Sequence, residues 1–202
     1  MSDAAPSDDW SLPWEGGCRC GALRFRVSAP PLISAACHCR GCQRMTGSAF
    51  SLTLMVPEAG FAVIAGAARR GGLGGALERG EAGPAGLAEA AAPGGPPPSE
   101  LDHRLCPACG SWVFTRLAAM GGIVNLRASM LDDAAWVAPF IETMRDEALP
   151  WALTPAPHGY ARFPDPEAFP QLLAAYAARG ARPPPRPAPR PAVSRAASGP
   201  GG

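Results

Sequence analysis

The chain has 202 residues, which is enough for one domain with a buried core, and its formal net charge is +1. That near-neutral balance excludes a strong overall field that would draw the chain to nucleic acid or to a membrane surface. The sequence has no run of about 18 apolar residues that could cross a membrane, and residues 1–10 lack the basic-then-apolar pattern of a secretion signal. We therefore expect a soluble, cytoplasmic protein with no membrane partner.

The N-terminal part of the chain leads into a first pair of cysteines. Residues 1–14 are expected to form a flexible N-terminus. The glycines around Cys18 and Cys20 allow a tight turn that brings the two sulfur atoms toward one ion. In residues 22–28 three apolar side chains alternate with two arginines, so this segment is predicted to be a half-buried strand.

The next cysteine stretch holds three thiols within six residues, at Cys37, Cys39 and Cys42. Three such thiols cannot pair off with one another, but they can converge on one soft metal ion. Zinc prefers four ligands, and three protein ligands leave the open position that distinguishes a catalytic zinc from a structural one. His38 lies between two of these ligands, and in an extended segment its side chain points to the opposite face, so we favour a role other than ligand for it.

Two further strands are predicted after this stretch, at residues 51–57 and 60–66, with a turn between them. Residues 67–99 are rich in glycine and proline and contain almost no large apolar side chains. Such a segment cannot bury enough apolar surface to offset its ordering entropy, so we predict a disordered insertion. The chain is expected to re-enter the fold at residues 102–105.

A third cysteine pair, Cys106 and Cys109, forms a C-P-x-C-G zinc-knuckle motif. Gly110 can adopt the positive φ that lets backbone N–H groups face the sulfur atoms. Strands are predicted at residues 111–116 and 123–130.

The C-terminal part is expected to be irregular over residues 136–160, where the aromatic side chains are interpreted as core. A last helix runs to Arg179, with Pro170 in its first turn and Gly180 at its end. Residues 179–202 are predicted to be a disordered, Pro/Arg-rich tail. Its spread arginines would give weak, salt-sensitive contacts at most, so we do not expect nucleic acid as a partner. These arginines are Arg182, Arg186, Arg190 and Arg195.

Seven cysteines divide naturally into four and three, and an odd number without a secretion signal argues against a disulfide framework. Cys106 and Cys109 need two partners to complete a tetrahedron, and the C-x-C pair near residue 20 can supply them. A closed four-cysteine zinc site would contribute directly to folding. Spacing alone leaves open that Cys37 and Cys39 partner the knuckle instead.

The order of these motifs resembles the glutathione-dependent formaldehyde-activating (GFA) family, which also includes the centromere-protein-V-like domains. The resemblance covers residues 15–66 and 100–178. It implies a mainly β, Mss4-like domain over residues 15–178, built of small antiparallel sheets held by zinc, with a short C-terminal helix. The residues that carry it are Gly17-Cys18-x-Cys20-Gly21, Cys37-His38-Cys39-x-x-Cys42, Gly47-x-x-Phe50, Cys106-Pro107-x-Cys109-Gly110 and Leu131-Asp132-Asp133.

The same resemblance implies two zinc ions per chain and assigns all seven cysteines. A structural zinc would be held by Cys18, Cys20, Cys106 and Cys109. A catalytic zinc would be held by Cys37, Cys39 and Cys42.

The activity implied is that of a zinc-dependent carbon–sulfur lyase resembling S-(hydroxymethyl)glutathione synthase. Such an enzyme adds a thiol, glutathione, to an aldehyde, formaldehyde or a related small electrophile. Zinc is a soft docking point that would keep the glutathione sulfur as thiolate. Arg40 and Arg44 could bind the carboxylates of glutathione, or could equally be solvated charges that offset an anionic zinc site.

Two alternatives stay open at this stage. One is a non-catalytic, zinc-stabilised binding module of the centromere protein V type. The other is a thiol-dependent lyase or transferase that uses a different electrophile or thiol. The general acid is also open, with His38, His103 and water as candidates.

Overall fold

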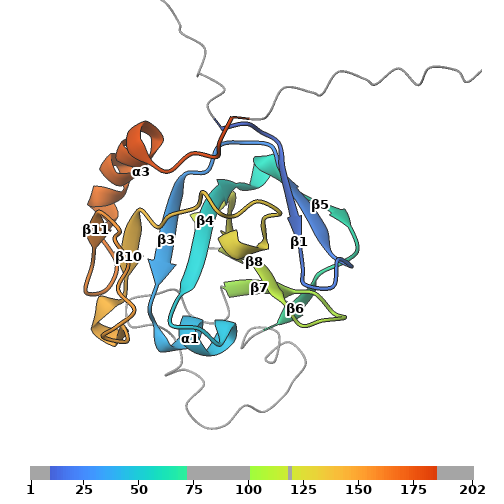
Figure 1. Cartoon of the computed structure of the whole chain (residues 1–202), viewed down its shortest axis with the longest axis horizontal. Coiled ribbons are helices and arrows are strands. Elements are labelled where there is room, and N and C mark those ends of the chain that lie inside the picture. The colour runs from blue at the N-terminus through green and yellow to red at the C-terminus, as the bar shows by residue number, and fades with distance from the viewer. Residues whose placement is uncertain (1–9, 72–100, 118–119, 186–202) are drawn as a thin grey trace, which may run out of the picture.

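The computed structural model describes residues 10–71, 101–117 and 120–185, and within them the chain is mainly β, as predicted (Figure 1). A three-stranded antiparallel sheet has the order β1-β2-β5. Its strands are β1 (Trp14–Gly17), β2 (Arg24–Val27) and β5 (Phe61–Ala65).

The second sheet has eight strands and is larger than the small sheets that were expected. It is also mixed rather than purely antiparallel, because β10 runs parallel to both of its neighbours, β3 and β11. In spatial order its strands are β11 (His158–Gly159), β10 (Ile141–Thr143), β3 (Ile33–Cys37), β4 (Ser51–Pro57), β9 (Ile123–Arg127), β8 (Trp112–Leu117), β7 (Leu101–Leu105) and β6 (Arg69–Gly71).

The predicted alternation over residues 22–28 is confirmed in β2. Leu23, Phe25 and Val27 are fully buried, whereas Arg26 faces solvent. Together with apolar side chains of β4, β8 and β9 they build the larger core, which fills the space between the two sheets. An isolated antiparallel bridge also joins Gly16 of β1 to Leu131, in the segment that follows β9.

The prediction that residues 1–14 are flexible is wrong for the described residues from Trp10 onward. Trp10 is buried and packs against the rings of Trp14, Trp136 and Tyr176, in a second core cluster at the β3 and β10 side of the large sheet. The ordering entropy of this segment is offset by the burial of large aromatic side chains. Residues 1–9 lie outside the described residues.

The predicted tail also begins later than expected, because its first residues pack on the body. Arg182 lies over the Trp10 ring, with 3.6 Å between its guanidinium carbon and the ring centroid, and donates to the Gly180 carbonyl. Beyond residue 185 the predicted tail lies outside the described residues.

The predicted insertion likewise starts later than residue 67. Arg69–Gly71 form β6, which pairs with β7 through the register Arg70 to Arg104. Backbone pairing to a strand edge needs no large apolar side chain, which is why composition missed it. Residues 72–100 lie outside the described residues.

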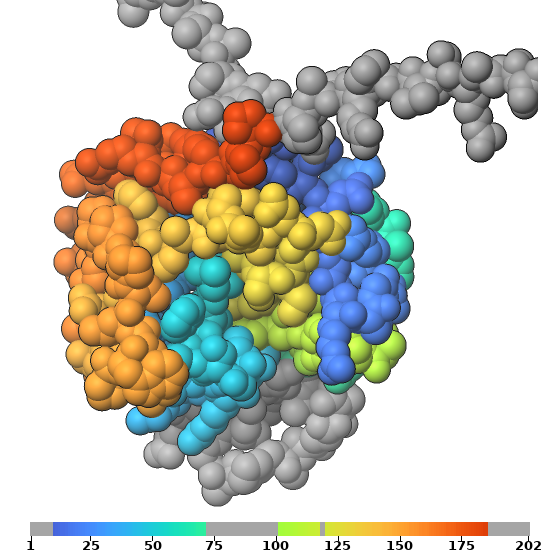
Figure 2. All heavy atoms as spheres, viewed as in Figure 1, coloured from blue at the N-terminus to red at the C-terminus, as the bar shows by residue number. Residues whose placement is uncertain are grey.

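Two α-helices and four short 3-10 turns complete the described chain. The predicted C-terminal helix is confirmed as α3 (Phe169–Arg179), with Pro170 in its first turn and Gly180 at its end. It buries Leu172 and Tyr176 against the β3 side of the sheet and lies along one edge of the molecule (Figure 2). The other elements are α1 (Arg40–Thr46) and the turns η1 (Glu58–Gly60), η5 (Ala128–Met130), η6 (Arg145–Glu147) and η7 (Pro166–Ala168). Among the described residues, no helix is both long and apolar enough to span a membrane.

Candidate metal centres and the hollow between them

Four cysteine thiols meet where the two sheets come together. Cys18 and Cys20 lie in the turn between β1 and β2, and Cys106 and Cys109 lie in the turn between β7 and β8. All four sulfur atoms lie within 4.8 Å of one another. The Sγ atoms of Cys18 and Cys20 are 3.5 Å apart, and those of Cys20 and Cys106 are 3.8 Å apart. A tetrahedron with zinc–sulfur bonds of about 2.3 Å has edges of about 3.8 Å, so this donor set fits zinc.

Backbone geometry holds these sulfur atoms in place. Gly21 and Gly110 both have positive φ, at 78° and 72°, as predicted for Gly110. The Leu23 N–H donates to Cys18 Sγ at 3.3 Å, and Ser111 Oγ lies 3.2 Å from Cys109 Sγ. The Ser111 hydroxyl and N–H lower the pKa of Cys109 to about 5, which favours the thiolate form that a metal ligand needs.

Three further thiols, Cys37, Cys39 and Cys42, converge at the junction of β3 and α1, with their sulfur atoms within 4.8 Å of one another. Cys37 ends β3, and Cys39 caps α1 by accepting a hydrogen bond from the Cys42 N–H at 3.3 Å. Turning from strand to helix within three residues is what brings positions 37, 39 and 42 to one side. Among the described residues, no fourth His, Cys, Asp or Glu ligand atom joins this group.

The pKa values of the three thiols indicate that a bound cation would stabilise this group. Hydrogen bonds from Cys39 and Cys42 lower the pKa of Cys37 to about 2, and the same interaction with Cys37 raises the pKa of Cys39 to about 11. The pKa of Cys42 is also raised, first by its hydrogen bond with Cys37. Without a metal, therefore, one thiolate forms at the expense of the other two, whereas a divalent ion would stabilise all three.

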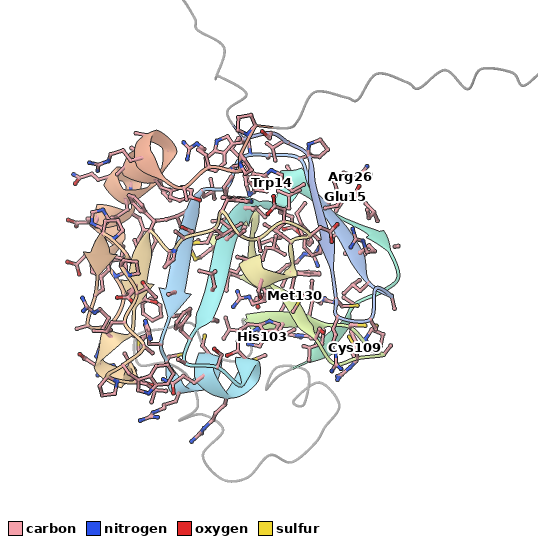
Figure 3. All side chains as sticks on the ribbon, viewed as in Figure 1. Trp14, Glu15, Arg26, His103, Cys109 and Met130 are labelled. Carbon is pink, nitrogen blue, oxygen red and sulfur yellow. The ribbon has the colours of Figure 1, made fainter. Side chains whose placement is uncertain are left out.

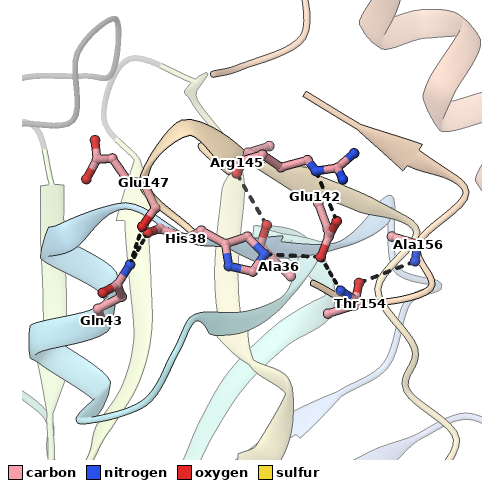
Figure 4. Close-up of polar contacts among 9 residues, drawn as sticks. Ala36, His38, Gln43, Glu142, Arg145, Glu147, Thr154 and Ala156 are labelled. Carbon is pink, nitrogen blue, oxygen red and sulfur yellow. Dashed lines mark hydrogen bonds and ion pairs between the residues drawn. The ribbon is translucent and has the colours of Figure 1, made fainter. Parts of the chain in front are cut away.

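The loop that carries these thiols is fixed from its other face by His38. As expected from the extended geometry, its imidazole is not one of the ligand atoms grouped with the three thiols. The ring is fully buried and lies with Nε2 3.1 Å from Glu142 Oε1 (Figure 4). Glu142, on β10, also accepts from the Thr154 N–H at 2.6 Å, and it lies 3.6 Å from Arg145 Nε. Burial raises the pKa of Glu142, but these hydrogen bonds outweigh it and leave the pKa below its usual value.

The segment that carries Glu142 and Glu147 also holds α1 in place. Gln43 donates through Nε2 to the carbonyls of His38 and Glu147, at 2.6 and 2.9 Å. The Arg40 N–H donates to Glu147 Oε2 at 2.6 Å. Sequence reasoning missed Glu142 and Glu147, because single acidic residues in a segment without periodicity carry no signal.

The residues proposed from sequence to bind glutathione are both exposed. Arg40 and Arg44 lie on α1, and within the described chain neither side chain makes a hydrogen bond or ion pair. His103, considered as a general acid, lies on β7 with Nδ1 2.8 Å from Thr115 Oγ1. Burial, with help from the nearby Arg127, lowers the pKa of His103 to about 4, so it is neutral at pH 7.

Between α1 and the C-x-x-C knuckle lies a hollow of about 510 Å³. Its lining includes Arg127, the last residue of β9. From the sequence, this residue was predicted to be part of a strand and was given no further role. Two residues that line the hollow, Met130 and Cys109, are labelled in Figure 3. Cys109 is the one described cysteine in its lining, and α1 contributes Met45 and Thr46. Arg19, Ser48 and Ser111 also line it.

Comparison with known proteins bears on these two groups. Residues 13–73 match the model of the family described as "Glutathione-dependent formaldehyde-activating enzyme". This part of the chain is similar to that family. The matched segment carries five of the seven cysteines, including the whole three-thiol group, and Cys106 and Cys109 lie beyond it.

Other comparisons of the chain are weaker. A structural-genomics crystal structure of a Rhodobacter sphaeroides protein is similar to it, with a TM-score of 0.38 and 16% identity over 58% of this chain and 87% of that one. A likeness at this level carries no argument about activity. The comparison with curated proteins gave no match.

Proposed function

We propose that this protein is a zinc-dependent enzyme of the carbon–sulfur lyase type, which adds glutathione to formaldehyde or to a related small electrophile. The observation that carries the proposal is the three-thiol group, which offers three ligand atoms and, among the described residues, no fourth. The match of residues 13–73 to the GFA family model points to the same chemistry.

The donor set supports zinc at both groups. Thiolate sulfur is a soft ligand that zinc binds well and that hard cations such as magnesium do not favour. In the four-thiol group, the 3.8 Å between the Sγ atoms of Cys20 and Cys106 also suits the zinc–sulfur bond length. When bound by three thiolates, zinc would supply a soft position at which a substrate thiol loses its proton near neutral pH.

The chain's own residues would perform three tasks in this reaction. Cys37, Cys39 and Cys42 hold the ion, and the pair of His38 and Glu142 keeps their loop in one conformation. The hollow beside α1 provides room for a thiol much larger than formaldehyde. Holding the two reactants together replaces a bimolecular encounter with an oriented one.

The overall chemistry is a simple addition. The thiol sulfur forms a bond to the carbonyl carbon, the carbon–oxygen π bond becomes a hydroxyl, and the proton lost by the thiol is balanced by the one gained at oxygen. Neither His38 nor His103 is assigned as the acid, because His38 is fully buried with its Nε2 on Glu142, and the pKa of His103 is lowered to about 4. We therefore assign this proton transfer to water.

Exchange NMR with ¹³C-formaldehyde and glutathione tests the proposal. The zinc-loaded chain should accelerate exchange between free formaldehyde and S-(hydroxymethyl)glutathione above the uncatalysed rate, and Cys39→Ser should remove the acceleration. Exchange at the uncatalysed rate with both metals bound would contradict catalysis and favour the binding-module alternative. Acceleration with other thiols or aldehydes, and not with this pair, would redirect the substrate assignment.

A further inference from the structure

The hollow between α1 and the C-x-x-C knuckle is lined by two arginines and, within the described chain, by no acidic side chain. Arg19 lies exposed at its rim, and Arg127 is 6% exposed at its floor. The rest of the lining mixes hydroxyl groups with apolar side chains. It includes Thr46, Ser48, Ser111, Ser129, Met45, Phe50, Leu52, Trp112 and Met130. This charge balance suits an anionic ligand.

Arg127 is held in one orientation by the face of Trp112. The guanidinium carbon lies 4.1 Å from the centroid of the Trp112 ring. Trp112 is fixed in turn, because its Nε1 donates to Thr115 Oγ1 at 3.0 Å and the His103 ring packs edge-on against it at 4.9 Å. A guanidinium that stacks on a ring directs its N–H donors outward in its own plane, where they can meet a planar carboxylate.

The guanidinium has spare hydrogen-bonding capacity. Arginine carries five N–H donors. Within the described residues, Arg127 donates from Nη2 to the Asn125 carbonyl at 3.2 Å, while its buried Nε has no partner and no carboxylate pairs with it. An unpaired buried charge of this kind is costly to the fold, so its retention needs a reason.

Three other cationic side chains show what ordinary arginines do in this fold. Arg24 is bonded to Asp132, Arg26 to Glu15, and Arg116 to Glu58. Arg116 is the nearest counterpart, because it lies on the neighbouring strand β8 and also stacks on an aromatic ring, that of Phe114 at 5.1 Å. Arg127 differs from it in being buried and in lacking a carboxylate.

We propose that Arg127 is the carboxylate anchor of the hollow, binding one carboxylate of the thiol substrate through paired N–H donors. Arg19 adds charge at the rim. This assignment rests on the proposed function for the identity of the ligand, and it replaces Arg40 and Arg44 as the residues that recognise glutathione. Arg127 is thereby a binding residue whose role is to place the thiol beside the three-thiol group.

A second explanation of Arg127 makes a different prediction. Its charge interacts with Cys37 and Cys42, so it could serve to offset the negative charge of a metal bound by three thiolates. In that case its loss would weaken metal binding and leave carboxylate recognition unchanged. The two explanations are therefore separable by measuring the metal and the carboxylate independently.

The test uses S-methylglutathione, which carries the carboxylates of glutathione but no free thiol, and its diethyl ester. Isothermal titration calorimetry with the metal-loaded full chain should show the acid binding at least about tenfold more tightly than the ester, as expected for a charge-assisted pair. Arg127→Met should abolish this preference, and Arg127→Lys should reduce it, because lysine keeps the charge without the planar fork. The matched control Arg116→Met should retain it in full.

Equal binding of the acid and the ester by the unmutated protein would overturn the assignment, whatever happens to the variants. So would an undiminished preference in a folded Arg127→Met chain, or a loss of metal in that chain with the preference intact. The response of a cobalt-loaded chain to 2-mercaptoethanol, a thiol without a carboxylate, tests the metal site separately. A cobalt response without a carboxylate preference contradicts the role of Arg127 alone. A carboxylate preference without a cobalt response supports Arg127 and contradicts the proposed function.

Discussion

The two cysteine groups differ in how far apart in the chain their ligands lie. The four-thiol group joins Cys20 to Cys106, 86 positions apart, and thereby ties the turn of the small sheet to the turn of the large one. The three-thiol group comes from one continuous stretch of six residues. A metal at the first would cross-link the fold, whereas a metal at the second would close a local loop that protein contacts already hold.

This difference teaches which group the fold depends on. The three-thiol loop is held by contacts of His38 and Gln43 with residues 142–147, independently of its sulfur atoms. Around the four-thiol group the described contacts are mainly short turns that the knuckles make with themselves and with Ser111. We therefore expect structure to follow the first group and ligand chemistry to follow the second.

The largest effect is expected from Cys106→Ser. A structural zinc contributes about 10–16 kcal/mol to folding in small domains, which is comparable with the entire stability of about 5–15 kcal/mol that a domain has. The variant should lose its cooperative unfolding transition, monitored by circular dichroism.

Cys39→Ser is the matched control for that experiment. Serine caps a helix well, so α1 keeps its N-terminal cap while one metal ligand is lost. This variant should remain folded and retain one metal per chain. Unfolding of both variants to the same extent would contradict the division into a structural and an open group.

An intermediate effect is expected from Glu142→Ala. Removing Glu142 leaves His38 buried without its partner, and breaking a buried pair in this way costs about 3 kcal/mol. Chemical denaturation should show that loss. Metal analysis should show weaker retention at the three-thiol group with the four-thiol group unaffected.

Glu147→Ala is the control from the same segment. Glu147 is half-buried and accepts one backbone N–H, from Arg40, so its loss should cost about 1 kcal/mol. A cost as large as that of Glu142→Ala would show that the whole segment, rather than the buried pair, supports the loop.

Part of this architecture could be predicted from the sequence. The run at residues 51–57 was recovered with its observed bounds, because β4 lies inside the large sheet and is mostly apolar and buried. The C-terminal helix was recovered because proline and glycine mark its ends. The strands β1, β3 and β10 were missed, since their glycines, alanines and short length carry little periodicity and their pairing depends on partners distant in the chain.

Part of the candidate site could also be predicted from the sequence. Cysteine spacing suggested groups of four and three, which the structure brings together, but their metals and roles remain proposals. Arg127 was missed because an arginine inside a predicted strand reads as solvent-facing, whereas the ring that its guanidinium lies over is that of Trp112, on the neighbouring strand. Burial of a charge is decided by tertiary contacts that local sequence does not encode.

The smallest effect is expected from Asp132→Asn, near the four-thiol side of the molecule. Hydrogen bonds from Arg24 hold the pKa of Asp132 below its usual value. A lowered folded pKa stabilises the fold above the unfolded pKa of about 3.9, and that contribution is lost as the pH falls through the folded value. Because the pair is largely exposed, the loss should be about 0.5 kcal/mol at pH 7.

Denaturation of Asp132→Asn and the unmutated chain at pH 7 and at pH 3 checks this. The difference between the two proteins should shrink at the lower pH. A constant difference at both values would show that the effect does not come from ionisation of Asp132.

The most direct test of the account is a thiol titration of the cobalt-loaded chain. Cobalt bound by thiolates gives charge-transfer bands, and the account predicts that glutathione changes the bands of one ion per chain, through the open position of the three-thiol group. S-methylglutathione, which has no ionisable thiol, should leave those bands nearly unchanged, and Cys39→Ser should abolish the response to glutathione. Bands that do not respond to millimolar glutathione, or that respond equally to S-methylglutathione, would contradict an open, thiol-binding metal centre at Cys37, Cys39 and Cys42.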